Sequence, residues 1–319
     1  MPLSNFIFSF NVVMPVFLVV FVGYLLRRSC LDPKTTSRLN WLVFNCALPL
    51  MLFRDIGNSD FATVMDGKLI LFAVVSTLVI FFITCLIAPK LVKPEGQGAF
   101  IQGVFRGNYA IVGLQIITNI LGSAHTDKAS LIITFIIPLY NILAVLILTI
   151  KSSNNESGKN ILGNIRKALI NIIRNPLIIG IAAGIPFSIL HIRLPLFLES
   201  GMNSLAGLTT PLALLAIGAS INMSQVRNKF KAAAIAAVIK LIVIPLIFLP
   251  IAFLIGLSGE QIVILYVMFA APTAINSFIM ADIMGNDSAL AANIVLLTTL
   301  GSLFTFTLGI FWLRTTGIV

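Results

Sequence analysis

The sequence predicts an all-α, polytopic membrane protein, and three observations support this fold class. Hydrophobic residues make up 58% of the 319 residues and charged residues only 10%, with a mean hydropathy of +1.05. The apolar residues gather in runs of about 20, the length that a helix needs to cross a bilayer. Short polar connections separate these runs. A soluble globular domain carries far more charge over this length.

The length rule gives ten candidate spans, and we predict one transmembrane helix for each. They cover roughly residues 6–26, 37–54, 68–89, 98–121, 129–150, 169–190, 201–222, 232–256, 260–284 and 289–313. Lysine and arginine gather in one set of connections, which includes Arg27, Arg28, Lys229 and Lys231. By the positive-inside rule these connections are cytoplasmic. We therefore expect a multi-pass protein of the inner or plasma membrane with both termini outside.

Composition also excludes several classes of function. The formal net charge of +10 does not predict a nucleic-acid partner, because the cations lie in short loops rather than on one solvated face. Cys30, Cys46 and Cys85 are widely spaced, with no CxxC pair, so we expect neither a disulfide framework nor a metal site. Enzyme motifs such as GxSxG, HExxH and the phosphate-binding loop are absent from the sequence. We expect no enzyme and no cofactor, and transport that a proton or other ion gradient drives.

The two halves of the chain contain similar short motifs at corresponding positions. Pro49 in LPLMLF corresponds to Pro211 in TPLALL, and Phe105 in FRGNYAIVG corresponds to Phe269 in FAAPTAINS, at nearly constant spacing. Five spans per half is an odd number, so the second half must be inverted in the membrane relative to the first, as in many secondary transporters. We divide the chain into a first five-helix repeat (1–150), a cytoplasmic linker (151–168) and a second, inverted five-helix repeat (169–319).

Spans 4 and 9 are predicted to be broken helices that cross near the middle of the membrane. Span 4 contains Arg106, Gly107 and Asn108, and span 9 contains Pro272, which lacks an N–H group and interrupts the helical ladder. Exposed backbone at such a break must face protein or a water-filled cavity. A half-helix starting near Asn108 points its positive end at the break, where Arg106 adds a full charge, so we predict an anion site. Span 9 adds neutral hydrogen-bonding groups to this site: Thr273, Asn276 and Ser277.

Three charged residues in the spans each have a functional and a structural interpretation. Arg106 either binds substrate or pairs with carbonyl groups freed at the break, and charge at this depth normally marks a transport pathway. Lys240 either belongs to the site or extends its ammonium group to the cytoplasmic surface. Asp282 is a candidate for coupling or gating, with simple placement near the inner interface as the alternative.

Polar residues in spans 2 and 5 extend the list of candidates. Asn45 precedes Pro49 by one helical turn and either lines the cavity or accompanies a kink. Tyr140 and Asn141 interrupt an otherwise apolar span 5, and they either face the cavity or pack inside the protein.

Five stretches of the sequence carry a family resemblance. They are LPLMLF in span 2, FRGNYAIVGL in span 4, NPLIIGIAAGI in span 6, TPLALLAIGASI in span 7 and APTAINSFIMADIMGNDSALAANIVLLTTLGSL across spans 9 and 10. Together they resemble the auxin efflux carrier family in its short bacterial form, whose members include malate and malonate permeases. The resemblance implies ten helices in two inverted repeats, with helices 4 and 9 crossing at their breaks.

The resemblance also implies a mechanism. Helices 1, 2, 6 and 7 would form a scaffold that commonly dimerises, and the other helices a transport domain that moves by an elevator-like step. Carried over by position, Arg106, Gly107, Asn108 and Pro272 would surround the carboxylate of the substrate.

We therefore predict a secondary active transporter for a small organic anion, a mono- or dicarboxylate such as malate or malonate. Its partners would be this substrate and the lipid bilayer. One alternative is an anion channel or a non-transporting membrane sensor on the same scaffold. Another is a carrier of a neutral or aromatic, auxin-like compound, in which Arg106 is purely structural.

Overall fold

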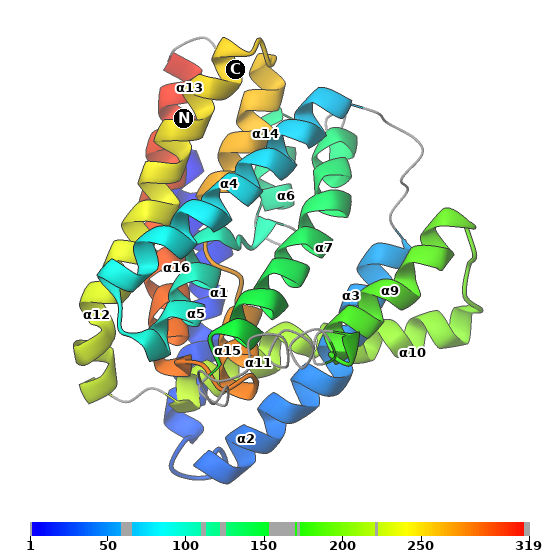
Figure 1. The fold of residues 1–319 in the computed structure, drawn as a ribbon, viewed down its shortest axis with the longest axis vertical. Helices are drawn as coiled ribbons and strands as arrows, with labels where there is room; N and C mark the ends of the chain where they lie inside the picture. Colours follow the sequence, from blue (N-terminus) through cyan, green and yellow to red (C-terminus); the bar gives the residue numbers. More distant parts are fainter. Residues whose placement is uncertain are drawn as a thin grey trace.

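The computed structural model describes residues 2–58, 66–109, 113–121, 126–152, 170, 173–220 and 223–315. In these ranges the regular structure consists of helices, with one isolated β-bridge between Gly107 and Thr273. Figure 1 shows the helices gathered into a bundle, with α9 and α10 on one side of it. The predicted all-α class is confirmed for this part of the chain.

Two series of helices make up the described chain, one on each side of the central segment. The first contains α1 (Pro2–Leu26), α2 (Pro33–Leu42), the π-helix η1 (Val43–Ala47), α3 (Leu48–Gly57), α4 (Gly67–Leu91), α5 (Pro94–Phe105), α6 (Leu114–Leu121) and α7 (Thr126–Ile150). The second contains α9 (Pro176–Ile189), α10 (Leu196–Gly207), α11 (Thr209–Ser220), α12 (Met223–Val238), the π-helix η4 (Ile239–Val243), α13 (Ile244–Leu254), α14 (Gly259–Ala270), α15 (Asn276–Ile283) and α16 (Ser288–Thr315).

Polar caps determine where several helices begin. The carboxylate of Asp32 accepts a hydrogen bond from the Thr35 N–H at 3.0 Å, and Pro33 occupies the first turn of α2. Hydrogen bonds from the Thr35 hydroxyl and N–H hold the pKa of Asp32 below its usual value. α14 begins with a capping box between Ser258 and Gln261. These caps lie in the connections between apolar helices, where the free N–H groups of a helix start need partners.

Within the described residues, six helical segments are long and apolar enough to cross a membrane: Pro33–Gly57, Gly67–Leu91, Ile132–Ile150, Leu196–Ser220, Arg227–Leu254 and Ser288–Leu313. Shorter apolar helices cover Met14–Leu26, Pro176–Ile189 and Gly259–Ala270. The protein is therefore a multi-pass membrane protein. It remains a prediction that the chain forms ten spans and that its two halves are inverted relative to each other.

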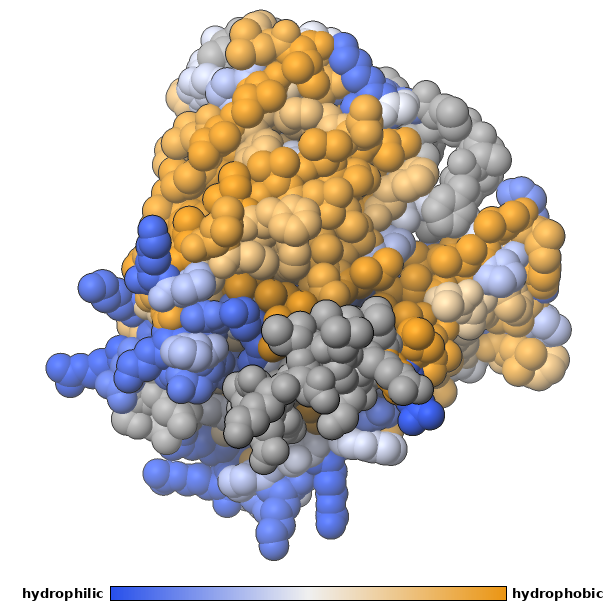
Figure 2. Space-filling model, in the orientation of Figure 1, coloured by the Kyte–Doolittle hydropathy of each residue, from blue (hydrophilic) through white to orange (hydrophobic). Residues whose placement is uncertain are grey.

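The surface separates into an apolar body and a hydrophilic end. Figure 2 shows orange, apolar atoms over most of the visible face and blue atoms mostly at the lower end. Large apolar side chains such as those of Leu86 and Leu254 are exposed, as lipid contact requires. The exposed cations Lys34 and Arg227 belong to helices whose first turns lie at the hydrophilic end, whereas α1 begins and α16 ends at the opposite end (Figure 1). Lys34 and Arg227, two of the cations expected in the cytoplasm, thus belong to helices that begin at the same end of the molecule.

The helices pack in two groups that position the site. α3 packs against α9 and α10, and α1 packs against α11. The other group consists of α4, α5, α7 and α12 to α16 with η4, which pack mainly against one another. α2 packs against α11 and belongs to the first group, and contacts of α1 with α16 and of α2 with α15 join the two groups. The interrupted helices described below lie in the second group.

Close approach of α1 and α11 depends on Gly218, and Gly218→Ala should destabilise the protein. A Cβ atom at this position would lie 2.0 Å from the carbonyl oxygen of Val20 and 2.8 Å from the backbone nitrogen of Tyr24. Small residues allow such approach in membrane helices, and overpacking costs about 1–3 kcal/mol. The measurement is the Tm of the purified protein. Gly201→Ala is the matched control, since nothing lies within 4 Å of its Cβ, and equal Tm values for both variants would contradict the prediction.

Candidate functional site

Two helices are interrupted side by side in the interior of the protein. α5 ends at Phe105 and α14 ends at Ala270, and extended residues follow each helix. Gly107 and Thr273 form an antiparallel bridge between the two extended segments. The N–H of Asn108 also donates a hydrogen bond to the carbonyl of Pro272 at 2.7 Å. The two breaks predicted from the sequence therefore meet.

Side chains satisfy the backbone groups that the breaks release. The Thr273 N–H donates to the Thr298 hydroxyl at 3.0 Å, and the Thr273 hydroxyl donates to the Gly103 carbonyl at 2.6 Å. Thr273 and Thr298 are both buried. Unpaired backbone groups at this depth would be costly, so these bonds hold α5, α14 and α16 together at the junction.

Thr298→Val should lower the Tm of the purified protein, because the isosteric change leaves the buried Thr273 N–H without its acceptor. A buried donor that loses its partner costs about 1–3 kcal/mol. Thr299→Val is the matched control: the neighbouring hydroxyl is also buried and donates only to the Val295 carbonyl of its own helix. A fall in Tm no larger than that of the control would show that the Thr298 hydroxyl does not stabilise the break.

Arg106 is buried at the end of α5, with 4% of its surface exposed. Its Nη2 donates to the Asn141 side-chain oxygen at 2.8 Å, and its Nη1 contacts the sulfur of Met280. A guanidinium group has five N–H donors, and a thioether is a weak acceptor. Among the described residues, no carboxylate forms an ion pair with Arg106.

Unpartnered polar atoms lie on α5 and α15, the two helices that meet at Arg106 and Met280. Within the described chain, the Gln102 Oε1, Asn276 Oδ1 and Ser277 Oγ atoms are buried and have no hydrogen-bond partner. Gln102 precedes Arg106 by one turn, and its amide nitrogen lies 3.5 Å from the Met280 sulfur. Asn276 and Ser277 share a face of α15 with Met280, because they precede it by four and three residues. Met280 thus places the unpartnered groups of α15 near the guanidinium.

The remaining predicted residues occupy different environments. Tyr140 is buried next to Asn141 and packs against the Phe105 ring, with centroids 5.9 Å apart. Asn45 is half-buried in η1, and its amide donates to the Trp41 carbonyl of the preceding α2 at 2.9 Å. Asn108 is also half-buried, and residues 110–112, where the predicted half-helix continues, lie outside the described residues. The structure brings Tyr140 to the break, whereas the Asn45 amide bonds to the backbone of its own span.

Lys240 and Asp282 contact groups that sequence reasoning does not identify. Lys240 is buried in η4, 1% exposed, and its Nζ lies 3.3 Å from the Val104 carbonyl of α5. Of the two interpretations of Lys240, extension to the cytoplasmic surface is wrong, because the amine turns toward the break. Asp282 is half-buried and accepts a hydrogen bond from the Asn40 amide of α2 at 2.7 Å. Asp282 thus links the two groups of helices.

Several residues at the break carry only a weak signal in the sequence. Gln102 is a polar residue in an apolar span one turn before Arg106, and this spacing would have identified it. Thr298 is one of many hydroxyl residues in the last span, and Met280 has an ordinary apolar side chain. Among the described residues no group of three or more histidines, cysteines, aspartates or glutamates is placed to hold a metal ion.

Comparison with known proteins identifies the family. Residues 8–310 match the family described as Membrane transport protein. The chain belongs to this family. Its membership confirms the resemblance to auxin efflux carriers drawn from the sequence, and it identifies the protein as a membrane transporter rather than an enzyme.

Relatives of this membrane transport protein are distant but span nearly its full length. It is 25% identical over 314 residues to the "Putative malonate transporter" of Rhizobium meliloti (strain 1021), with 96% of each chain covered. It is 22% identical to an uncharacterized transporter of Methanothermobacter thermautotrophicus, over 93% of this chain and 96% of that one. An uncharacterized transporter of Methanocaldococcus jannaschii is 24% identical, again over 93% and 96% of the two chains.

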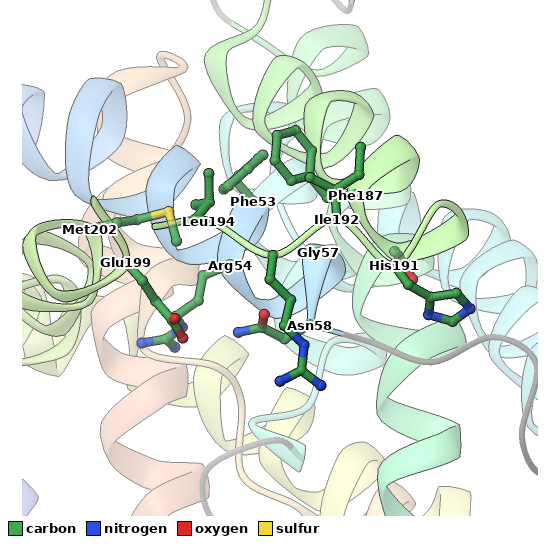
Figure 3. Close-up of a pocket in the computed structure, with 12 residues that line it drawn as sticks. Phe53, Arg54, Gly57, Asn58, Phe187, His191, Ile192, Leu194, Glu199 and Met202 are labelled. Atoms are coloured by element: carbon green, nitrogen blue, oxygen red, sulfur yellow. The ribbon is translucent and has the colours of Figure 1, made fainter. Parts of the chain in front are cut away.

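This membrane transport protein also has a cavity of about 300 Å³ away from the break, where α3 and α9 end and α10 begins. Figure 3 shows its lining side chains, with Phe53 and Phe187 packed edge to face at 4.9 Å between centroids. None of the predicted site residues is among them. The lining residues are Phe53, Arg54, Gly57, Asn58, Phe187, Ser188, His191, Ile192, Arg193, Leu194, Glu199 and Met202.

Proposed function

We propose that the protein is a secondary transporter for a small organic anion, a mono- or dicarboxylate such as malate or malonate. The observation that carries this proposal is the buried Arg106 guanidinium, which has no described carboxylate partner and contacts Met280 of α15, a helix that also carries the unpartnered Asn276 and Ser277 side chains. A charge inside a membrane protein is costly unless it serves a pathway or a partner. A substrate carboxylate would supply that partner and form bidentate bonds with the guanidinium.

The proposed binding site combines this cation with neutral groups from both breaks. Arg106, Gly107 and Asn108 of the first half would face Pro272 and Thr273 of the second, with Asn276 and Ser277 one turn further on. The Ser277 and Phe278 N–H groups already bond to the carbonyls of Ala274 and Ile275. Side chains of α15 rather than its backbone would therefore bind the substrate. Asn141 would orient the guanidinium, and Tyr140 and Asn45 would contact the rest of the substrate or its path.

We further propose that the two halves, 1–150 and 169–319, are inverted repeats joined by a cytoplasmic linker. The contact between Asn108 and Pro272 supports this proposal. Phe105 and Phe269 correspond in the sequence, and the same spacing makes Asn108 the counterpart of Pro272. Contact between two corresponding residues is expected where a pseudo-two-fold axis passes through an inverted pair.

The proposed mechanism is an elevator-like step of one group of helices past the other. The scaffold would consist of the predicted spans 1, 2, 6 and 7, which contain α1, α2 with α3, α9, and α10 with α11 and also offer a dimer interface. The group containing α5, α14 and α15 would move. The Asn40–Asp282 bond joins the two groups, so Asp282 is a candidate gate or proton-coupling group. An ion gradient would drive the movement in the inner or plasma membrane, with both termini outside.

The name of the Rhizobium meliloti relative supports a dicarboxylate substrate, and the carboxylate site is consistent with it. Exchange in proteoliposomes tests the proposal. Vesicles loaded with unlabelled malonate, malate or a monocarboxylate should accumulate the labelled compound by counterflow, and the rate should saturate. Rates that do not saturate would indicate a channel, and no flux with any carboxylate would favour a sensor. Counterflow only with a neutral or aromatic compound would favour the auxin-like alternative.

A further inference from the structure

The side chain of Lys240 is one of the largest fully buried side chains of the protein. A lysine in a membrane helix usually extends its ammonium group to the nearest interface. Lys240 lies instead with its Nζ against the end of α5, where no described acid is close enough for an ion pair. The Lys240 amine is therefore buried at a defined position, where its charged form is costly unless a negative group stabilises it.

This position is the carboxyl end of a half-helix. The last four carbonyl groups of a helix lack partners within it, and together they carry about half a negative charge. In α5, three of these carbonyl groups each accept a hydrogen bond from a different donor. The Gln102 carbonyl accepts from the Arg106 N–H, the Gly103 carbonyl from the Thr273 hydroxyl, and the Val104 carbonyl from Lys240 Nζ. The ammonium group thus neutralises the negative end of α5.

The helix that carries Lys240 is irregular at this position, and its packing brings the side chain to α5. Residues Ile239–Val243 form the π-helix η4, which inserts an extra residue into the turn between α12 and α13. η4 packs against α5, α14 and α16, the helices of the break. A Cβ atom on Gly107 would lie 3.5 Å from Lys240 Nζ, so the ammonium group also borders the extended segment between the half-helices.

In secondary transporters, carbonyl groups of unwound segments and the carboxyl ends of half-helices coordinate the coupling sodium ion. Lys240 Nζ occupies such an environment. We infer that the Lys240 ammonium group, a cation covalently attached to the chain, occupies the position where other secondary transporters bind a coupling sodium ion. The protein would then bind and transport its substrate without sodium. The claim that transport needs no sodium rests on the proposed function. The claim that the Lys240 ammonium group replaces a bound cation does not.

The test measures the Tm of the purified full-length protein in sodium chloride and in choline chloride of equal ionic strength. The wild type should show the same Tm in both salts. Lys240→Ala should lower the Tm in choline, and sodium or methylammonium, which fit the vacated position, should recover most of the loss. Lys240→Met fills the space without charge, so its Tm should fall and neither cation should restore it. Lys231→Ala, at an exposed lysine of α12, should not respond to the cation.

A wild-type Tm that rises with sodium would overturn the inference, because a separate cation site would then exist. A Lys240→Ala variant that sodium and methylammonium leave unchanged would also overturn it. If that variant does not fold, Lys240→Ser in the presence of methylammonium provides the same comparison, and failure to recover folded protein there counts against the inference. Substrate exchange with and without sodium separates the two proposals. Exchange that requires sodium contradicts the tethered cation alone, and rescue without any exchange contradicts the proposed function alone.

Discussion

Arg106→Gln should abolish the stabilisation that a dicarboxylate gives the purified protein. A ligand that binds only the folded state raises its stability by mass action, so the shift in Tm measures binding. Removing one partner of a buried, hydrogen-bonded charge pair costs about 2–5 kcal/mol, which weakens Kd by roughly 30-fold or more. Glutamine keeps a donor for the Asn141 oxygen but has neither the charge nor the planar fork of the guanidinium. Exchange in proteoliposomes should fall to the background rate.

Two further variants make this result specific. Arg106→Lys retains the charge without the bidentate geometry and should give weaker binding than the wild type but stronger binding than Arg106→Gln. Arg193→Gln removes an exposed arginine that lines the separate cavity between α3, α9 and α10, and it should bind substrate normally. A dicarboxylate shift that persists in Arg106→Gln would assign the arginine a structural role through Asn141 and Met280. The Tm of Arg106→Gln without substrate shows separately whether the charge of Arg106 is needed for the stability of the fold.

The helical fold was predictable because a bilayer leaves the backbone few alternatives. Backbone groups in hydrocarbon must bond within their own segment, so a long apolar run is almost always a helix. The positions of the breaks were also predictable, since Pro272 cannot continue a helix and an Arg-Gly-Asn sequence has no place in an unbroken span. α14 does end two residues before Pro272, and α5 ends one residue before Arg106.

The contents of the site were less predictable, because they depend on how neighbouring helices rotate. The position of Lys240 in its predicted span left its side chain able to reach the cytoplasmic surface. The π-turn of η4 and the packing of η4 direct the side chain to α5 instead. Met280 contacts both Gln102 and Arg106 through a thioether, a role that hydropathy does not distinguish from ordinary packing. The pairing of Asn40 with Asp282 joins residues far apart in the chain, and no local pattern indicates it.

Cross-linking α2 to α15 should stop transport, while a cross-link inside the proposed mobile group should not. Asn40 and Asp282 approach through a hydrogen bond of 2.7 Å, and they belong to the two groups of helices that must slide past each other. Cysteines at these two positions, with Cys30, Cys46 and Cys85 replaced by alanine, can be bridged by a mercuric ion and released by excess thiol. Substrate exchange is the measurement, because it needs no net flow of a coupled ion. Exchange should cease on bridging and return on release.

The control pair is Lys229→Cys with Asp287→Cys, since these residues form an ion pair between α12 and the start of α16. Both helices belong to the proposed mobile group, so bridging them leaves the relative movement of the two groups free. A rocking or channel mechanism predicts a different pattern. If the Asn40–Asp282 bridge leaves exchange unchanged, α2 and α15 do not separate during transport and the elevator step is wrong. If both bridges block exchange, the contacts inside the proposed mobile group must change too, and the group does not move as one body.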